Sequence, residues 1–337
     1  MRLGIFDHLD DSGRPLAQHY EERLKLGERY DAGPFHALHL AEHHATPLGT
    51  APSPNVFLAA LAQRTKRLRF GPMVYCMPLY HPIRLAEEIC MLDQISNGRL
   101  EFGIGRGISP FELAYFGVDN DRSREMLQEG VEIVRRALAG GDVHFEGKHY
   151  RVDGMPFVLS PKQKPHPPFW YGVGYVEAAE RAAEGGMNVI SNQVPKVVRE
   201  VLQAYRARWQ ALGRDEAALP FLGVSRHIVI AEDGAEALAT ARRAYRRWRA
   251  SFVVLWDRHG GFPPGVNLPP EIDDMIAVDQ AFVGTPGRVA EGLAQVAEAT
   301  SANYLACRFS FGDLTFDETR RSLDLFLERV MPDVVRS

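Results

Sequence analysis

The stretch Phe35–Pro47, FHALHLAEHHATP, gathers four histidines around one carboxylate, and its conformation decides between two folds. Read as a helix, it spells H-x-x-E-H through His39, Glu42 and His43, an inverted zinc-protease motif with both imidazoles on one face. Read as the end of a strand, it forms a tip from which His43 or His44 can point into a pocket. A proline precedes the stretch and is able to open a helix, so the rest of the chain must decide.

The overall composition is that of a soluble enzyme. The 337 residues are 45% hydrophobic and 24% charged, with a formal net charge of −4, which gives no attraction for polyanions or anionic membranes. No apolar run approaches the roughly 20 residues of a membrane span, and the first residues lack a signal-peptide core. We therefore expect a cytoplasmic protein with no nucleic-acid and no membrane partner, and free thiols at Cys76, Cys90 and Cys307.

Short β-rich runs alternate with amphipathic segments along the chain, without two halves of different composition. Each run is expected to form a strand that a helix follows. The expected strands are residues 3–6, 35–40, 68–75, 99–104, 169–173, 187–190, 221–231 and 304–309. This repetition predicts a single (β/α)8 TIM barrel over residues 1–337, in which the βα loops at one end form the site. A doubly wound sheet is the alternative.

Two segments interrupt this alternation. Residues 142–168 are interpreted as an inserted hairpin, with arms parted at Glu146 and Gly147, and a proline-rich loop. Residues 260–270, GGFPPGVNLPP, are too rich in proline and glycine for regular structure. The surrounding segment 257–283 is therefore our candidate lid over the site.

A barrel favours the strand interpretation of the histidine-rich stretch. His36 and His39 then become strand positions, and His43 and His44 lie in or near the following βα loop with Glu42. A neutral imidazole there can donate or accept a proton near pH 7, and Glu42 could fix its tautomer. We therefore take His43, Glu42 and His44 as the candidate catalytic group. The alternative is that some of these histidines only cap backbone groups.

Glycine-rich turns follow two later strands and suit an anionic or flat ligand. In GIGRG, residues 103–107, Gly105 lets backbone approach a ligand and Arg106 offers a fork for a phosphate or a ring edge. The dinucleotide pattern G-x-G-x-x-G is not met, because the third glycine is missing. In YGVGYVEAAE, residues 171–180, Gly174 precedes a helix whose free N–H groups can bind a cofactor phosphate. Each turn can also be a plain connection.

Four motifs, in this order, resemble those of the bacterial luciferase-like flavin-dependent monooxygenases. They are EHH at 42–44, HPIRLAEEICMLDQISNGRLEFGIGRG at 81–107, YFG at 115–117 and VGTPGRV at 283–289. The resemblance covers nearly the whole chain and implies a (β/α)8 barrel that uses reduced FMN or, in one branch, the deazaflavin F420. It also implies that a C4a-hydroperoxyflavin, formed from reduced FMN and O2, oxygenates a small, mostly apolar organic substrate.

The resemblance also implies roles for individual residues. The family's active-site histidine falls on His43, and a non-proline cis peptide beneath the flavin falls near Met73 and Val74. Luciferases carry a reactive cysteine where this chain has Gly105, so light emission is not expected, and the glycine should open room near the flavin ring. Cofactor contacts are implied at Arg106, Gly174, Tyr175 and Ala178.

The same resemblance implies partners and leaves alternatives. A separate NAD(P)H-dependent flavin reductase would supply reduced FMN, and the barrel would form a homodimer. An F420-dependent oxidoreductase of the same fold is one alternative, and a non-catalytic flavin-binding partner subunit is another. A zinc hydrolase with His39 and His43 as ligands and Glu42 as base is the alternative we set aside, so we expect no metal.

Overall fold

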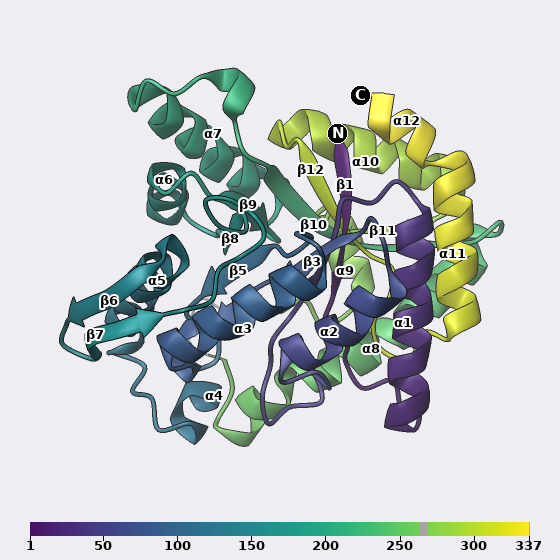
Figure 1. Ribbon diagram of the computed structural model, residues 1–337. Helices are drawn as coiled ribbons and strands as arrows, with labels where there is room; N and C mark the ends of the chain where they lie inside the picture. Colours follow the sequence, from purple (N-terminus) through teal and green to yellow (C-terminus); the bar gives the residue numbers. More distant parts are fainter. Residues whose placement is uncertain (263–267, 337) are drawn as a thin grey trace.

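The chain forms a barrel of parallel strands with its helices packed around the outside (Figure 1). The computed structural model describes residues 1–262 and 268–336. The barrel strands are β1 (Arg2–Asp7), β2 (Ala37–Leu40), β3 (Arg69–Pro72), β4 (Tyr75–Cys76), β5 (Phe102–Gly105), β8 (Phe169–Gly172), β9 (Asn188–Ser191), β10 (Leu222–Ile230) and β12 (Tyr304–Arg308).

Strand pairing closes this sheet into a barrel. Hydrogen-bonded neighbours follow the order β3-β2-β1-β12-β10-β9-β8-β5-β4, with parallel pairing throughout. A further parallel bridge, between Phe70 of β3 and Leu100 just before β5, closes the ring. The predicted (β/α)8 TIM barrel is therefore confirmed.

Helices follow the strands and cover the outside of the barrel (Figure 1). They are α1 (Leu16–Ala32), α2 (Pro54–Arg64), α3 (Pro82–Ile95), α5 (Ser123–Ala139), α6 (Val176–Glu184), α7 (Pro195–Ala211), α8 (Gly234–Arg258), α10 (Pro286–Thr300), α11 (Phe316–Arg329) and α12 (Met331–Arg336). Several begin with proline, which suits a first turn whose N–H groups have no partner in the helix. None of the described helices is long and apolar enough to cross a membrane.

The histidine-rich stretch forms a strand and a loop. Residues 37–40 are β2, and His39 pairs in register with Phe6 on one side and Gly71 on the other. Glu42, His43 and His44 follow in the loop at the carboxyl end of this strand. The helical H-x-x-E-H interpretation is therefore wrong, because backbone pairing with both neighbouring strands holds this segment extended.

Two parts of the sheet differ from the expected strands. The third strand is divided into β3 and β4, and the peptide bond between them, Met73–Val74, is cis, where the resemblance placed it. A short strand that we did not predict, β11 (Ala281–Gly284), pairs with the second half of β10. It occupies the end of the segment 257–283, which also contains the short helix α9 (Ile272–Ala277).

The insertion after α5 forms an antiparallel hairpin of β6 (Gly141–Glu146) and β7 (Arg151–Phe157). It projects from the barrel beside α5 (Figure 1). Another short helix, α4 (Pro110–Tyr115), follows β5 and approaches the carboxyl ends of the strands.

Alternating side chains divide the apolar interior into two layers. Outward residues of the strands pack against the helices, and inward residues fill the barrel. In β12, for example, Leu305 and Cys307 face the helices, whereas Tyr304 and Ala306 belong to the inner layer. The inward-facing ring of Tyr304 fits because residue 4 is glycine. A Cβ at that position would overlap the phenol oxygen. The inner layer comprises Phe6, Ala41, Met73, Trp170, Ile190, Tyr304 and Ala306.

Candidate active site

Loops at the carboxyl ends of the strands meet the second half of α8 around His43. A small cavity of about 10 Å³ remains between them. Its lining is mostly apolar on the side of α8 and polar on the side of the barrel. The lining residues are His43, Thr46, Leu48, Ile108, Ser109, Glu112, Phe252, Leu255 and Trp256. The carboxyl end of the strands is where TIM-barrel enzymes keep their active sites.

The imidazole of His43 is held by Glu112 on α4. Its Nδ1 lies 3.1 Å from Glu112 Oε1, and the backbone N–H of His44 donates to Glu112 Oε2 at 2.8 Å. Ser109 caps α4 and accepts a hydrogen bond from the N–H of Glu112, which fixes the start of that helix. A carboxylate at Nδ1 favours the tautomer with the proton on Nδ1 and leaves Nε2 as an acceptor.

Glu42 does not contact His43, contrary to our expectation. Its Oε1 lies 2.9 Å from His44 Nε2, and its Oε2 accepts hydrogen bonds from the N–H of Cys76 and the hydroxyl of Tyr80. Oε1 is therefore engaged within the loop and Oε2 on the side of β4. Burial and the Glu42 charge raise the pKa of Tyr80, so the phenol stays protonated and donates. Glu42 and His44 thus support the loop, and the partner of His43 comes from another strand.

His8, which directly follows β1, is a site residue that we missed. Its ring stacks on the His43 ring with centroids 5.7 Å apart, and Trp248 of α8 lies at the same centroid distance on another side. Burial, with smaller effects of Arg308, His43 and His227, holds the pKa of His8 well below 6.5. The ring is therefore neutral at physiological pH. A histidine immediately after a barrel strand was the signal that could have identified it.

The arginine-rich segment of α8 ties this helix to the loops around the site. Arg242 pairs with Asp273 on α9, Arg243 with Asp313 after β12, and Arg247 with Asp11 after β1. At its carboxyl end, α8 also contacts α4 through stacked rings of Phe111 and His259. These contacts hold α8 over the site. Of the candidate lid 257–283, residues 263–267 lie outside the described residues.

The predicted phosphate contacts lie on two adjacent strands. Arg106 follows β5, and Gly174 and Tyr175 follow β8, its hydrogen-bonded neighbour. Tyr175 precedes the first turn of α6, in which the backbone N–H of Ala178 has no partner within the helix. The Arg181 side chain, which we did not predict, donates to the Tyr175 hydroxyl at 3.1 Å. Among the described residues, neither arginine forms an ion pair.

Gly105, Met73 and Val74 meet inside the barrel. A Cβ at Gly105 would overlap the Val74 side chain, so the missing side chain makes room for Val74 and not for a ligand. This corrects our expectation that Gly105 opens space near a flavin ring. Met73 is buried in the inner layer, and Val74 packs partly buried against it. Together they form an apolar surface on which a flat ring could lie.

The two histidines of the supposed zinc motif face different partners. His39 Nε2 lies 2.8 Å from the hydroxyl of Tyr304 inside the barrel, whereas His43 faces Glu112. Burial lowers the pKa of His39 to about 3, so this ring is neutral and structural. Within residues 1–262 and 268–336, no cluster of three or more histidine, cysteine, aspartate or glutamate residues is arranged to hold a metal ion.

The fold and the site together define a (β/α)8 barrel with a histidine–carboxylate pair at the carboxyl ends of its strands. Residues 1–303 match the luciferase-like monooxygenases, and the chain belongs to this family.

Similar proteins include monooxygenases from several bacteria. The oxygenase component of the flavin-dependent trigonelline monooxygenase of Acinetobacter baylyi is 34% identical over 193 residues, which are 56% of this chain and 53% of that protein. The crystal structure of monooxygenase RslO1 from Streptomyces bottropensis is 30% identical with a TM-score of 0.88, covering 98% of this chain and 99% of that chain.

A third similar protein shares the fold. The oxygenating constituent of 3,6-diketocamphane monooxygenase from Pseudomonas putida, a type II Baeyer-Villiger enzyme in complex with FMN, is 22% identical with a TM-score of 0.82. The comparison covers 98% of each chain.

Proposed function

We propose that this chain is the oxygenase component of a two-component monooxygenase, which uses reduced FMN and O2 to oxygenate a small, mostly apolar organic molecule. The observation that carries this proposal is the His43–Glu112 pair, set against a mostly apolar wall at the carboxyl end of the barrel. A named oxygenase component among the relatives supports the two-component arrangement. An NAD(P)H-dependent flavin reductase would then be the functional partner.

The residues after β5 and β8 fit the phosphate of FMN. Arg106 and Arg181 provide positive charge that no described carboxylate neutralises, and the first turn of α6 provides backbone N–H donors, among them that of Ala178. Gly172, at the end of β8, has open space where a Cβ would stand. The Tyr175 side chain is 47% exposed and can turn toward the ligand. Met73 and Val74 provide the surface for the flavin ring.

His43 is the proposed proton-handling group. Reduced flavin supplies the electrons that activate O2 when it is bound. With Nδ1 held by Glu112, Nε2 of His43 is the ring nitrogen free to accept or return a proton beside the oxygen and the substrate. The neutral His8 ring stacks on His43 and keeps its plane in place.

The wall from α8 serves to exclude water. Phe252, Leu255 and Trp256 lie opposite His43, and Ile108 adds a further apolar side chain. A dry site protects an activated oxygen species from loss as H2O2. The cavity of about 10 Å³ has room for no more than a water molecule, so α8 or its neighbours would have to shift to admit a substrate beside His43.

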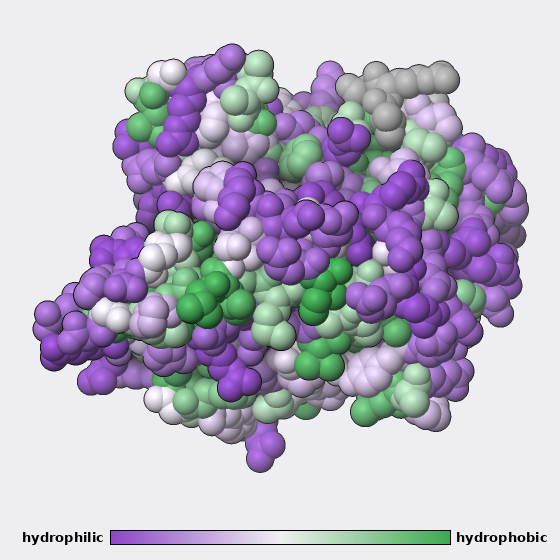
Figure 2. Space-filling view, in the orientation of Figure 1, coloured by the Kyte–Doolittle hydropathy of each residue, from purple (hydrophilic) through white to green (hydrophobic). Residues whose placement is uncertain are grey.

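We propose that the chain forms a homodimer through α2 and α3. Val56, Met91 and Ile95 on these helices expose 73%, 55% and 49% of their surface, respectively. Figure 2 shows apolar side chains gathered over this part of the molecule. Exposed apolar groups on neighbouring helices are typical of an interface between subunits.

The test of the proposed function is anaerobic titration with reduced FMN, then with reduced F420, followed by mixing with O2. Wild type should bind reduced FMN more tightly than reduced F420, and after mixing with O2 it should release H2O2 slowly. His43→Ala should bind FMN normally and release H2O2 at least tenfold faster, whereas Arg106→Ala should bind FMN more weakly. Preference for F420 would favour the dehydrogenase alternative, and bound FMN that does not react with O2 would favour a non-catalytic subunit.

A further inference from the structure

A buried arginine lies inside the barrel mouth, close to the proposed active site. Arg308 ends β12, and it points inward because Tyr304 and Ala306, four and two residues earlier, belong to the inner layer. Its guanidinium carbon lies 4.2 Å from the centre of the Phe6 ring, and its Nε donates to Ser225 Oγ at 2.8 Å. Only 7% of the residue is exposed.

Arg308 has no counter-ion among the described residues. None of their carboxylates lies within ion-pair distance of its guanidinium, whereas four arginines of α8 pair with carboxylates and Arg249 donates to a carbonyl. Its ionisable neighbours, His8 and His227, are neutral, because burial and the Arg308 charge hold their pKa values well below 6.5. The barrel mouth therefore carries one uncompensated positive charge.

A second buried arginine lies on the neighbouring strand, in register with Cys307 and therefore on the helix side of the sheet. Arg226 lies on β10 with its side chain fully buried, and its two terminal nitrogens donate to the carbonyls of Ser225 and Gln193. Burial lowers the pKa of Arg308 to about 9, with a smaller effect of Arg226, so Arg308 stays charged at neutral pH. The Asp279 charge partly offsets the lowering effect of burial on the pKa of Arg226.

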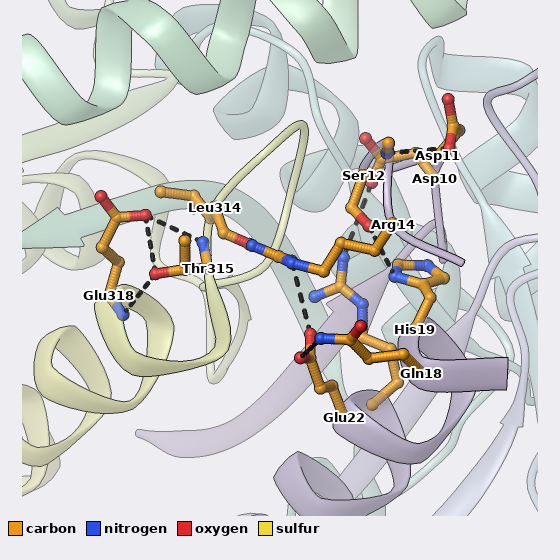
Figure 3. A network of polar contacts seen from close by, with 12 residues as sticks. Asp10, Asp11, Ser12, Arg14, Gln18, His19, Glu22, Leu314, Thr315 and Glu318 are labelled. Atoms are coloured by element: carbon orange, nitrogen blue, oxygen red, sulfur yellow. Dashed lines mark hydrogen bonds and ion pairs between the residues drawn. The ribbon is translucent and has the colours of Figure 1, made fainter. Parts of the chain in front are cut away.

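The loops on both sides of Arg308 are fixed, so the guanidinium is preorganised. The carboxylate of Asp10, after β1, accepts a hydrogen bond from the N–H of Gly312, after β12. Figure 3 shows Arg14 between Glu22 on α1 and the carbonyl of Leu314, beside the capping box of Thr315 and Glu318. Fixed loops prevent the charge from relaxing into water.

The charge lies within reach of the proposed proton-handling group. The Phe6 ring, against which the Arg308 guanidinium packs, lies 5.0 Å from the His8 ring between centroids, and His8 in turn stacks on His43. An anionic group on Arg308 would place the rest of a small ligand against His8, with its far end toward His43. The Trp248 ring, beside His8, would contact the apolar part of such a ligand.

We propose that the substrate carries a carboxylate and that Arg308 binds it. This rests on the proposed function, because it names the substrate class of the same site. A guanidinium is planar and offers parallel N–H donors that match a carboxylate. The hydroxyl of Ser225 orients the Arg308 guanidinium but, being uncharged, does not neutralise its charge. An ion buried without a partner is costly to the free protein, and a substrate carboxylate supplies that partner on binding.

The experiment compares benzoate with benzamide, which has the same shape and no charge. Binding to flavin-free protein is followed by tryptophan fluorescence, because Trp248 lies beside His8. Wild type should bind benzoate at least tenfold more tightly than benzamide. Arg308→Met should lose this preference, and Arg84→Met, at a position on the exposed surface of α3, should keep it. Equal affinity of wild type for both probes, or a preference that persists in Arg308→Met, overturns the proposal.

Thermal unfolding of the same variants separates a binding role from a structural one. Removal of an uncompensated charge should leave Arg308→Met at least as stable as wild type, and benzoate should raise the Tm of wild type only. The proposal is overturned if Arg308→Met loses much stability, Arg308→Lys restores it, and neither the variants nor wild type prefer benzoate. Arg308 would then be a structural residue.

Flavin binding distinguishes failure of this inference from failure of the proposed function. Arg308→Met should bind reduced FMN as wild type does. If it loses FMN affinity while benzoate binding is unchanged, the guanidinium serves the flavin and the carboxylate proposal is wrong. If wild type prefers benzoate but neither binds FMN nor consumes O2, the anion site stands and the proposed monooxygenase function fails.

Discussion

Replacement of Asp10 by asparagine should stabilise the folded chain at neutral and alkaline pH. Asp10 is fully buried in the loop after β1, and its Oδ2 accepts the hydrogen bond of Gly312 at 2.6 Å. Its Oδ1 has no hydrogen-bond partner among the described residues, and Arg23 lies 4.0 Å from it. Burial raises the pKa of Asp10 from 3.8 to about 7, although the Arg23 charge opposes this shift.

The sign and size of the effect follow from this pKa. A raised carboxyl pKa means that the folded state binds the proton more tightly than the unfolded chain does. The resulting stabilisation is complete below about pH 4 and is lost as the pH rises through 7. A shift of about three pH units corresponds to roughly 4 kcal/mol of unfolding free energy. Asparagine copies the protonated form, because it keeps an oxygen for Gly312 and carries no charge.

Urea unfolding of wild type and Asp10→Asn between pH 5 and pH 8.5 measures this effect. The stability advantage of the variant should increase with pH and reach a few kcal/mol at the upper end. Asp11→Asn is the matched control, because Asp11 is partly exposed and paired with Arg247, and its loss should bring no rising advantage. An Asp10→Asn difference that does not change with pH would refute the reasoning.

Two further changes test the site and the assembly. Glu112→Gln should speed H2O2 release from the reduced FMN complex by about tenfold or more, because His43 loses its charged partner. The affinity for FMN, measured alongside, should not change. Equal rates of H2O2 release in wild type and variant would contradict this role. Met91→Glu should convert the dimer to a monomer in sedimentation velocity, because it places a charge on the exposed apolar face of α3. Leu212→Glu, at the end of α7, is the control and should leave the dimer intact. A dimer that survives Met91→Glu would exclude this interface.

The barrel strands were predictable because buried parallel strands are short apolar runs that end in glycine or polar residues. The histidine-rich stretch was ambiguous locally, and only its place in the repeated pattern favoured a strand. β11 was not predicted, because AFVG is short and runs directly into the proline that opens α10. No local pattern reveals that it pairs with the second half of β10.

The site was predictable only in part, because its partners are brought together by the fold. His43 stands out in its motif, but its carboxylate, Glu112, lies 69 positions away on a helix of six residues. Glu42 was the nearest carboxylate in sequence and proved to face the other side of the loop. Arg308 could have been noticed as a charged residue at the end of an otherwise uncharged strand, YLACR.

The packed inner layer of the barrel has a consequence for the order of events in turnover. Trp170 and Tyr304 are fully buried there, and Glu101 closes the layer beneath them through its contacts with Arg69 and Trp170. This filled layer blocks passage through the barrel, so in the proposed function flavin and substrate would both enter at the carboxyl end. The ligand whose site lies deeper in the barrel would then have to bind first. If the proposed reductase docks at this end, it would block the substrate, so flavin delivery and departure of the reductase would precede substrate binding.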